Sequence, residues 1–210
     1  MLRRALLVCG IVSSFLYVGM NVFVPMRWPA YSSAAQTVSE LSAIGAPTRS
    51  LWVPLGIVYT VLMAAFGWGV LISAGRNRRL RVVGSLLIGY GLIGLAWPPM
   101  HLREVLAAGG ATLTDTLHIT WAMVTVVLML LAIGFGAAAL GPRFRRYSVV
   151  TIAMLATCGV LTTMSAPRVS ANLPTPLIGV WERVNVGVFL LWVVVLATAL
   201  LSRSRVRNRH

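Results

Sequence analysis

Long apolar segments, separated by shorter polar stretches, dominate the sequence. A stretch of roughly 20 apolar residues can cross the hydrocarbon core of a bilayer as an α-helix. Such segments lie at residues 5–24, 51–74, 82–98, 116–140, 148–166 and 180–201. We therefore predict an all-α, polytopic membrane protein in which residues 1–210 form a single membrane domain, a six-transmembrane-helix bundle.

The first apolar segment has a second interpretation. Arg3 and Arg4 precede it, as basic residues precede the apolar region of a cleaved signal peptide, and Ser33-Ala34-Ala35 resembles a cleavage site. The segment is longer than the roughly 7–15 residues usual for that apolar region. We therefore predict that it is the first transmembrane helix.

The polar stretch after this segment contains a motif for a short helix. Residues 37–40 (Thr-Val-Ser-Glu) fit a capping box. In this motif the Thr37 hydroxyl accepts a hydrogen bond from the Glu40 backbone N–H, and the Glu40 carboxylate accepts one from the Thr37 backbone N–H. Gly45 favours a helix end shortly afterwards. We predict a short interfacial or re-entrant helix over residues 38–44.

Composition agrees with a membrane protein. The chain is 58% apolar, and 10% of its residues are charged, well below the roughly 25% of an ordinary soluble domain. All 18 basic residues are arginines, and only four residues are acidic, which gives a net charge of +14. In a soluble chain this balance would suggest nucleic acid as a partner.

The distribution of the arginines indicates membrane topology instead. Most of them flank alternate connections, without acidic neighbours: Arg3, Arg4, Arg76, Arg78, Arg79, Arg81, Arg143, Arg145, Arg146, Arg203, Arg205, Arg207 and Arg209. The positive-inside rule predicts that this side is cytoplasmic, with both termini on it, and an even number of spans agrees. We expect a protein of the cell (plasma) membrane, of inner-membrane type, whose arginines contact anionic lipid headgroups and which binds no nucleic acid.

Polar residues gather on the predicted outer side, close to the ends of the spans. The candidate ligand-binding residues there are Ser39, Glu40, Arg49, His101, Asp115, His118, Glu182 and Arg183. Charged groups at this depth need a partner or a function. We predict a polar pocket that binds or handles a membrane lipid or a small apolar or anionic ligand, with the arginines favouring an anionic headgroup.

A metal-dependent hydrolase acting on outer-leaflet lipid is the first alternative. His101, Asp115 and His118 offer nitrogen and oxygen donors that suit zinc, and a catalytic zinc site has three protein ligands and a water. In this hypothesis Glu182 or Glu40 is the general base. The candidate phosphate-binding residues are Arg183 and Arg49.

A structural or assembly protein with an ion-paired outer lid is the second alternative. Here Asp115 pairs with an arginine, Glu182 pairs with Arg49 or Arg168, and Glu40 serves as a helix cap. Ion-coupled transport is disfavoured, because no acidic or basic residue lies in the middle of a span.

Three motifs carry a resemblance to a known family. The run from Tyr31 to Arg49, the pair Asp115-x-x-His118 and the run Gly179-x-Trp181-Glu182-Arg183 resemble the DUF998 family of integral membrane proteins, over essentially the whole chain. The resemblance implies six spans. It also implies a set of key positions: Ser39, Glu40, Gly45, Asp115, His118, Glu182 and Arg183. The family's name records an unknown function, so the resemblance implies no activity.

Overall fold

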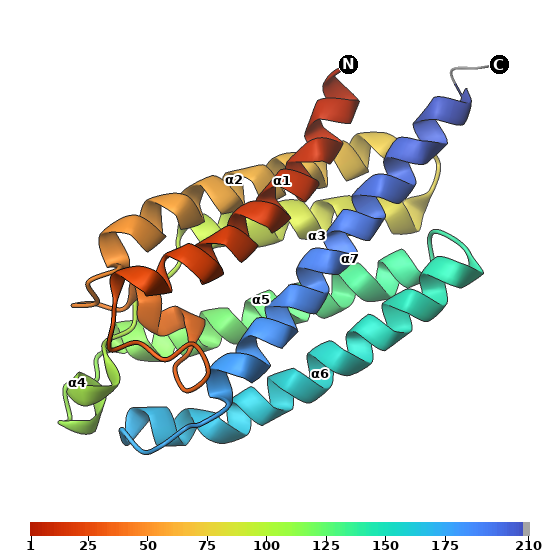
Figure 1. The fold of residues 1–210 in the computed structure, drawn as a ribbon. Coiled ribbons are helices and arrows are strands. Elements are labelled where there is room, and N and C mark those ends of the chain that lie inside the picture. The colour runs from red at the N-terminus through yellow and green to blue at the C-terminus, as the bar shows by residue number, and fades with distance from the viewer. Residues whose placement is uncertain (208–210) are drawn as a thin grey trace.

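Six long helices form a closed ring. The computed structural model describes residues 1–207, with side chains to residue 202. Its elements in chain order are α1 (Leu2–Phe23), η1 (Pro25–Arg27), η2 (Val38–Ser42), α2 (Arg49–Ser73), α3 (Arg78–Leu95), α4 (Arg103–Ala107), α5 (Leu113–Ala137), α6 (Pro142–Ser170) and α7 (Ile178–Arg207). Each long helix packs on the next one along the chain, and α7 packs back on α1 (Figure 1).

Five of the described helices are long and apolar enough to cross a membrane, namely α1, α2, α5, α6 and α7. The chain therefore has the architecture of a multi-pass membrane protein. Helix α3 occupies the place of the remaining predicted span. It has 18 residues, which is about 27 Å at 1.5 Å per residue, and Arg78, Arg79 and Arg81 lie in its first turn. The apolar part of α3 is therefore shorter than the hydrocarbon core. Helix α3 packs between α2 and α5 in the ring, but the count of six spans stays a prediction.

Several helices extend beyond the predicted apolar segments. Helix α5 begins at Leu113 rather than at residue 116, and α6 begins at Pro142 rather than at residue 148. A proline is favourable at the first helical position because its missing N–H would be unpaired there in any case. Helix α6 also continues through Pro167 to Ser170. Polar first and last turns can be helical, so hydropathy alone underestimates helix length.

The predicted helix over 38–44 is shorter and of a different type. It is a 3-10 helix that ends at Ser42, and the predicted capping box between Thr37 and Glu40 is present. The backbone N–H of Ile44 donates to the Met100 carbonyl at 2.7 Å, which draws the chain out of the helix. Gly45 has a φ of +90°, a conformation that favours glycine. Whether η2 lies in the interface or re-enters the membrane stays a prediction.

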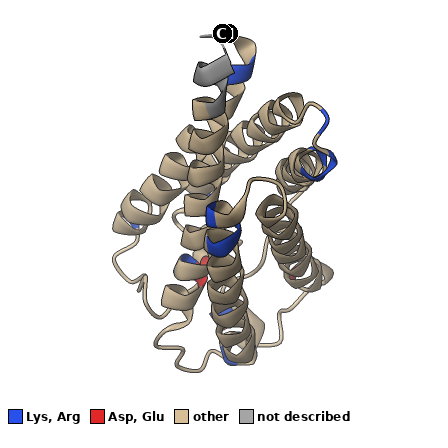
Figure 2. Cartoon of the chain, turned by 90° about the vertical axis from the view of Figure 1, so that its right-hand side faces the viewer, with Lys and Arg blue, Asp and Glu red and all other residues tan. Residues whose placement is uncertain are grey.

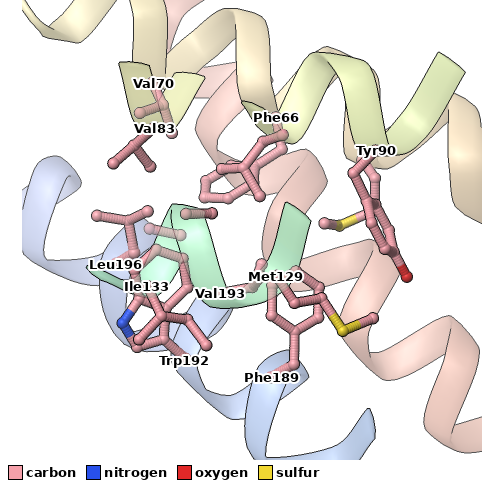
Figure 3. Packing of buried hydrophobic residues seen from close by; sticks show 14 of the residues in the cluster. Phe66, Val70, Val83, Tyr90, Met129, Ile133, Phe189, Trp192, Val193 and Leu196 are labelled. Atoms are coloured by element: carbon pink, nitrogen blue, oxygen red, sulfur yellow. The ribbon is translucent and has the colours of Figure 1, made fainter. Parts of the chain in front are cut away.

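The main hydrophobic core lies inside the ring. Phe66 from α2, Met129 and Ile133 from α5, and Phe189 and Trp192 from α7 pack together there (Figure 3). All five are buried. A smaller cluster beside η2 contains Met20, Val24, Tyr31, Val38, Leu41 and Trp52, so η2 is attached to the bundle through its apolar side.

Most of the arginines lie at one end of the bundle, and all four acids lie at the other end together with the remaining arginines. We call the end with the N-terminus, the α2–α3 turn and the α5–α6 turn the basic end, because these segments carry Arg3, Arg4, Arg76, Arg78, Arg79, Arg81, Arg143, Arg145 and Arg146 (Figures 1 and 2). The four acids lie on η2, α4, α5 and the start of α7, at the other end, which we call the acidic end. The side chains of Arg203, Arg205, Arg207 and Arg209 lie outside the described residues.

Helices α2 and α3 approach each other most closely at glycines. A Cβ atom added at Gly84 would lie 2.7 Å from the Leu71 nitrogen and 2.9 Å from the Gly67 carbonyl oxygen. Small residues at helix contacts let backbones approach in this way in membranes. The α2–α3 contact therefore requires a residue without a side chain at position 84.

We predict that Gly84→Ala lowers the free energy of unfolding by about 1–3 kcal/mol, because the new methyl group forces two backbones apart. Gly89→Ala is the matched control, since an added Cβ on that residue of α3 meets nothing within 4 Å. Reversible unfolding of both variants in mixed detergent micelles measures the difference. Equal stability of the two variants would contradict the close contact.

Candidate functional site

The predicted site residues gather around η2 at the acidic end. Ser39 and Glu40 belong to η2, Asp115 and His118 to the first turns of α5, and Glu182 and Arg183 to the first turns of α7. Contacts to the η2 segment come from α4, α5 and α7, as the following distances show. The structure therefore brings these residues together at one end of the molecule, and their function stays a prediction.

A buried ion pair joins η2 to α4. Arg103 donates from Nε to Glu40 Oε1 at 2.7 Å and from Nη2 to Glu40 Oε2 at 2.8 Å. Glu40 is 0% exposed and Arg103 is 8% exposed. The hydrogen bonds to Glu40 raise the pKa of Arg103 above its ordinary value, so the guanidinium stays charged. This two-point geometry is the strong form of a charge-assisted hydrogen bond.

Glu40 also performs its predicted role as a helix cap. Its Oε2 accepts from the Thr37 backbone N–H at 2.7 Å and from the Thr37 hydroxyl at 3.0 Å. Gln36 donates to Oε1 at 3.2 Å. Both carboxylate oxygens are thus satisfied within the protein, and this arrangement gives no support to Glu40 as a general base.

Asp115 has a different partner from the arginine that we expected. Its Oδ1 accepts from the His101 backbone N–H at 2.7 Å, and its Oδ2 lies 2.9 Å from His101 Nδ1. Oδ2 also accepts from the Thr112 backbone N–H at 2.8 Å, which forms a capping box at the start of α5. The nearby Arg103 already binds Glu40. Asp115 therefore attaches His101 and Thr112, which both precede α5, to the first turn of that helix.

His118 links α5 to η2. Its Nδ1 lies 2.8 Å from the Pro98 carbonyl oxygen, and its Nε2 lies 3.1 Å from the Ser39 hydroxyl oxygen. A carbonyl oxygen can only accept, so Nδ1 carries the proton, and Nε2 of the neutral ring accepts from Ser39. Trp97 packs on the imidazole with ring centroids 5.4 Å apart.

Glu182 holds the start of η2, and this corrects a second pairing prediction. Its Oε2 accepts from the Val38 backbone N–H at 2.6 Å. The two arginines that we expected as partners are engaged elsewhere, because Arg49 donates to the Ser42 carbonyl and Arg168 donates to the Pro174 carbonyl at 2.9 Å. The orphan N–H groups of a helix start are a favourable place for a carboxylate.

Arg183 holds the loop that precedes η2. Its Nη1 donates to the Ser33 carbonyl at 2.7 Å and its Nη2 donates to the Tyr31 hydroxyl at 2.7 Å. Burial raises the pKa of Tyr31 to about 12, so the phenol stays protonated and donates in turn to the Thr37 carbonyl at 2.7 Å. Arg183 is thus a structural contact in this loop and offers no free phosphate-binding fork.

The three residues predicted as zinc ligands do not assemble into a metal site. Among the residues that the structure describes, no group of three or more His, Cys, Asp or Glu side chains is placed to hold a metal ion. His101 and Asp115 are paired, but both ring nitrogens of His118 are directed at Pro98 and Ser39. The donor geometry therefore does not fit zinc.

Arg49 lies at a separate feature of the acidic end. It lines a shallow groove of about 490 Å³ together with Ala46, Ser50, Val53 and Pro54. The groove is formed by the start of α2 and the residues just before it. Its lining therefore combines two polar residues, Arg49 and Ser50, with apolar ones.

Sequence reasoning missed three residues that contribute to this end. Arg103 was not among the candidate site residues because no local sequence pattern predicts that an arginine at this position is buried. Thr112 could have been found, since Thr112-x-x-Asp115 has the spacing of a capping box before an apolar run. Thr175, which donates to the Ala35 carbonyl at 2.7 Å, has no local signal, because its partner is 140 residues away.

We predict that Arg103→Ala destabilises the protein by roughly 3–5 kcal/mol, because it leaves the Glu40 carboxylate buried without its partner. Glu104→Ala is the control, since Glu104 is exposed on the same short helix and surface changes cost within about 0.5 kcal/mol. Denaturant titrations of both variants in detergent give the comparison. An Arg103→Ala variant as stable as Glu104→Ala would show that the pair is not buried.

Comparisons with known proteins place the chain in one family. No curated protein and no solved structure matches it. A family model with the description "Protein of unknown function (DUF998)" matches residues 11–199, which includes every candidate site residue. The chain therefore belongs to the DUF998 family.

Proposed function

We propose that this membrane protein binds an anionic lipid headgroup in the groove beside Arg49 at the acidic end. The observation that carries the proposal is the combination of a half-buried arginine with an open groove whose lining is both polar and apolar. A membrane lipid has the same two parts, since a charged phosphate adjoins an apolar body.

The chemistry of the groove supports an anion. The hydrogen bond to the Ser42 carbonyl uses one N–H of Arg49, whereas a guanidinium has five. Arg49 is also the first residue of α2, and the dipole of a helix favours negative charge near its N-terminus. The exposed Ser50 adds a hydroxyl donor beside it. These donors fit phosphate oxygens, and Val53 and Pro54 supply apolar lining.

The polar network around η2 holds the start of α2, which forms the groove. Thr48, which precedes Arg49, donates from its hydroxyl to the Leu41 carbonyl at 2.6 Å. The start of α2 is thereby attached to η2, and η2 is attached to α4 and α7 through Glu40 and Glu182. In this proposal the ion-paired residues form a rigid platform, and the ligand binds at its edge.

The charge sorting supports an orientation of this platform. Arginine-rich connections favour the cytoplasm, which would put the basic end inside the cell and the acidic end at the outer leaflet of the plasma membrane. Attachment of a reporter after residue 210, or in the 108–111 connection, distinguishes the two sides. We expect a fluorescent protein to be active at the first position and alkaline phosphatase at the second. The reverse pattern would contradict the orientation.

We predict that Arg49→Ala weakens binding of phosphatidylglycerol roughly tenfold or more, since hydrogen bonds to a charged group contribute about 1.5–3 kcal/mol. Native mass spectrometry of delipidated protein titrated with phosphatidylglycerol or phosphatidylcholine gives the affinities. Arg49→Lys should keep part of the preference for the anionic lipid.

Arg168→Ala is the matched control. Arg168 is an exposed arginine at the same end of the bundle, but it does not line the groove. Its removal should leave the affinity for phosphatidylglycerol within about twofold, because distant surface charges are screened. An equal loss in both variants, or no preference of the wild type for phosphatidylglycerol, would overturn the proposal.

A further inference from the structure

We propose that Ser39 is a nucleophile activated by His118, in a site that cleaves a carboxylic ester of a membrane lipid. The site is distinct from the Arg49 groove and uses none of its residues. The observation behind it is the ordered chain from the Ser39 hydroxyl through the imidazole of His118 to the Pro98 carbonyl.

The direction of these hydrogen bonds is the one that a serine nucleophile requires. The Pro98 carbonyl fixes the proton on Nδ1, which leaves the lone pair of Nε2 directed at the Ser39 hydroxyl 3.1 Å away. Nucleophile, base and a third group that orients the base are the general parts of such a site. A backbone carbonyl takes the third position here, where many enzymes use a carboxylate.

Other contacts hold Ser39 and His118 in place without using the Ser39 hydroxyl or the His118 Nε2 atom. The Ser39 carbonyl accepts from the Ser42 hydroxyl at 2.7 Å, and Glu182 holds the preceding residue through its backbone N–H. On the other side, Trp97 packs on the His118 ring. A catalytic geometry needs this kind of support from residues around it. Glu182 and Trp97 are positioning residues in this proposal.

Exposure separates Ser39 from its neighbours. Ser39 is partly exposed, whereas Val38 before it is 3% exposed and Glu40 after it is 0% exposed. His118 is 6% exposed, so the base is shielded from water behind the nucleophile. This proposal requires that a reagent reach the hydroxyl from the exposed side of Ser39 while the imidazole stays in a water-poor setting, which strengthens its interaction with the developing charge.

The depth of the pair indicates the substrate class. His118 lies five residues into α5, about 8 Å along the helix axis at 1.5 Å per residue. The apolar span follows it, and Trp97 beside it is of the type that marks the membrane interface. Ester carbonyls of membrane lipids occupy the layer between headgroup and acyl chains, and this proposal places Ser39 in that layer.

The step balances with water as the only co-reactant. Ser39 Oγ forms a bond to the ester carbonyl carbon while its proton moves to His118 Nε2, and the alcohol leaves with that proton as the C–O bond breaks. Water then attacks the acyl-Ser39 carbonyl and gives a proton to Nε2. Release of the carboxylic acid returns that proton to Ser39 Oγ.

A fluorophosphonate probe tests this directly on the full-length protein in lipid nanodiscs. Ser39 Oγ should form a bond to phosphorus as fluoride leaves, and peptide mass spectrometry should locate the adduct on Ser39. Loss of the base in His118→Gln should slow labelling by on the order of 10²-fold or more. Ser39→Ala should abolish it, whereas Ser33→Ala, which removes a more exposed serine hydroxyl, should leave it unchanged.

Wild-type protein that gives no adduct on Ser39 would overturn the proposal and leave the Ser39–His118 bond as a structural link between η2 and α5. This result needs no variant, so it stands even if a substitution prevents folding. Labelling of Ser33 at the same rate as Ser39 would also overturn it, because exposure would then explain the reaction. None of these outcomes depends on phosphatidylglycerol binding at Arg49, so the two proposals fail separately.

Discussion

Hydrocarbon offers no hydrogen-bond partners, and this constraint shapes the acidic end of the molecule. Backbone outside helices must find donors and acceptors within the protein when it lies near the membrane. Between α1 and α2 the chain makes loops and the two 3-10 helices η1 and η2, whose internal hydrogen bonds pair only part of this backbone. Side chains from later parts of the sequence supply others: Arg183 binds the Ser33 carbonyl, Glu182 binds the Val38 N–H, and Thr175 binds the Ala35 carbonyl.

These side chains give the acidic end its order. Glu40 is fully buried at the edge of a bundle whose long helices are mostly apolar, and an isolated charge there would be costly. Its bidentate pair with Arg103 and its capping bonds to Thr37 offset that cost. The network holds Ser39 against His118 and, through Thr48, holds the start of α2. Both proposed activities therefore depend on one platform, although they use different residues of it.

Sequence patterns predicted the parts of this structure that depend on local or periodic signals. Apolar segments placed five helices that are able to span a membrane, the sorting of arginines predicted the two ends, and the Thr37–Glu40 spacing predicted the cap of η2. The pairing partners were wrong for Asp115 and Glu182, because partner choice depends on which donors the tertiary fold brings close. Arg103 binds Glu40, and Asp115 accepts hydrogen bonds from His101 and Thr112 instead. The Ser39–His118 bond connects residues 79 positions apart, so no local pattern announces it.

The central claim is that residues 37–40 form an ordered unit held by side chains from distant helices. Hydrogen–deuterium exchange of the full-length protein in nanodiscs measures this most directly. The backbone N–H groups of Thr37, Val38 and Glu40 are all bonded, so they should exchange as slowly as amides in the long helices. Exchange at the rate of an unstructured peptide in this segment would contradict the claim, and with it the platform on which both proposed sites depend.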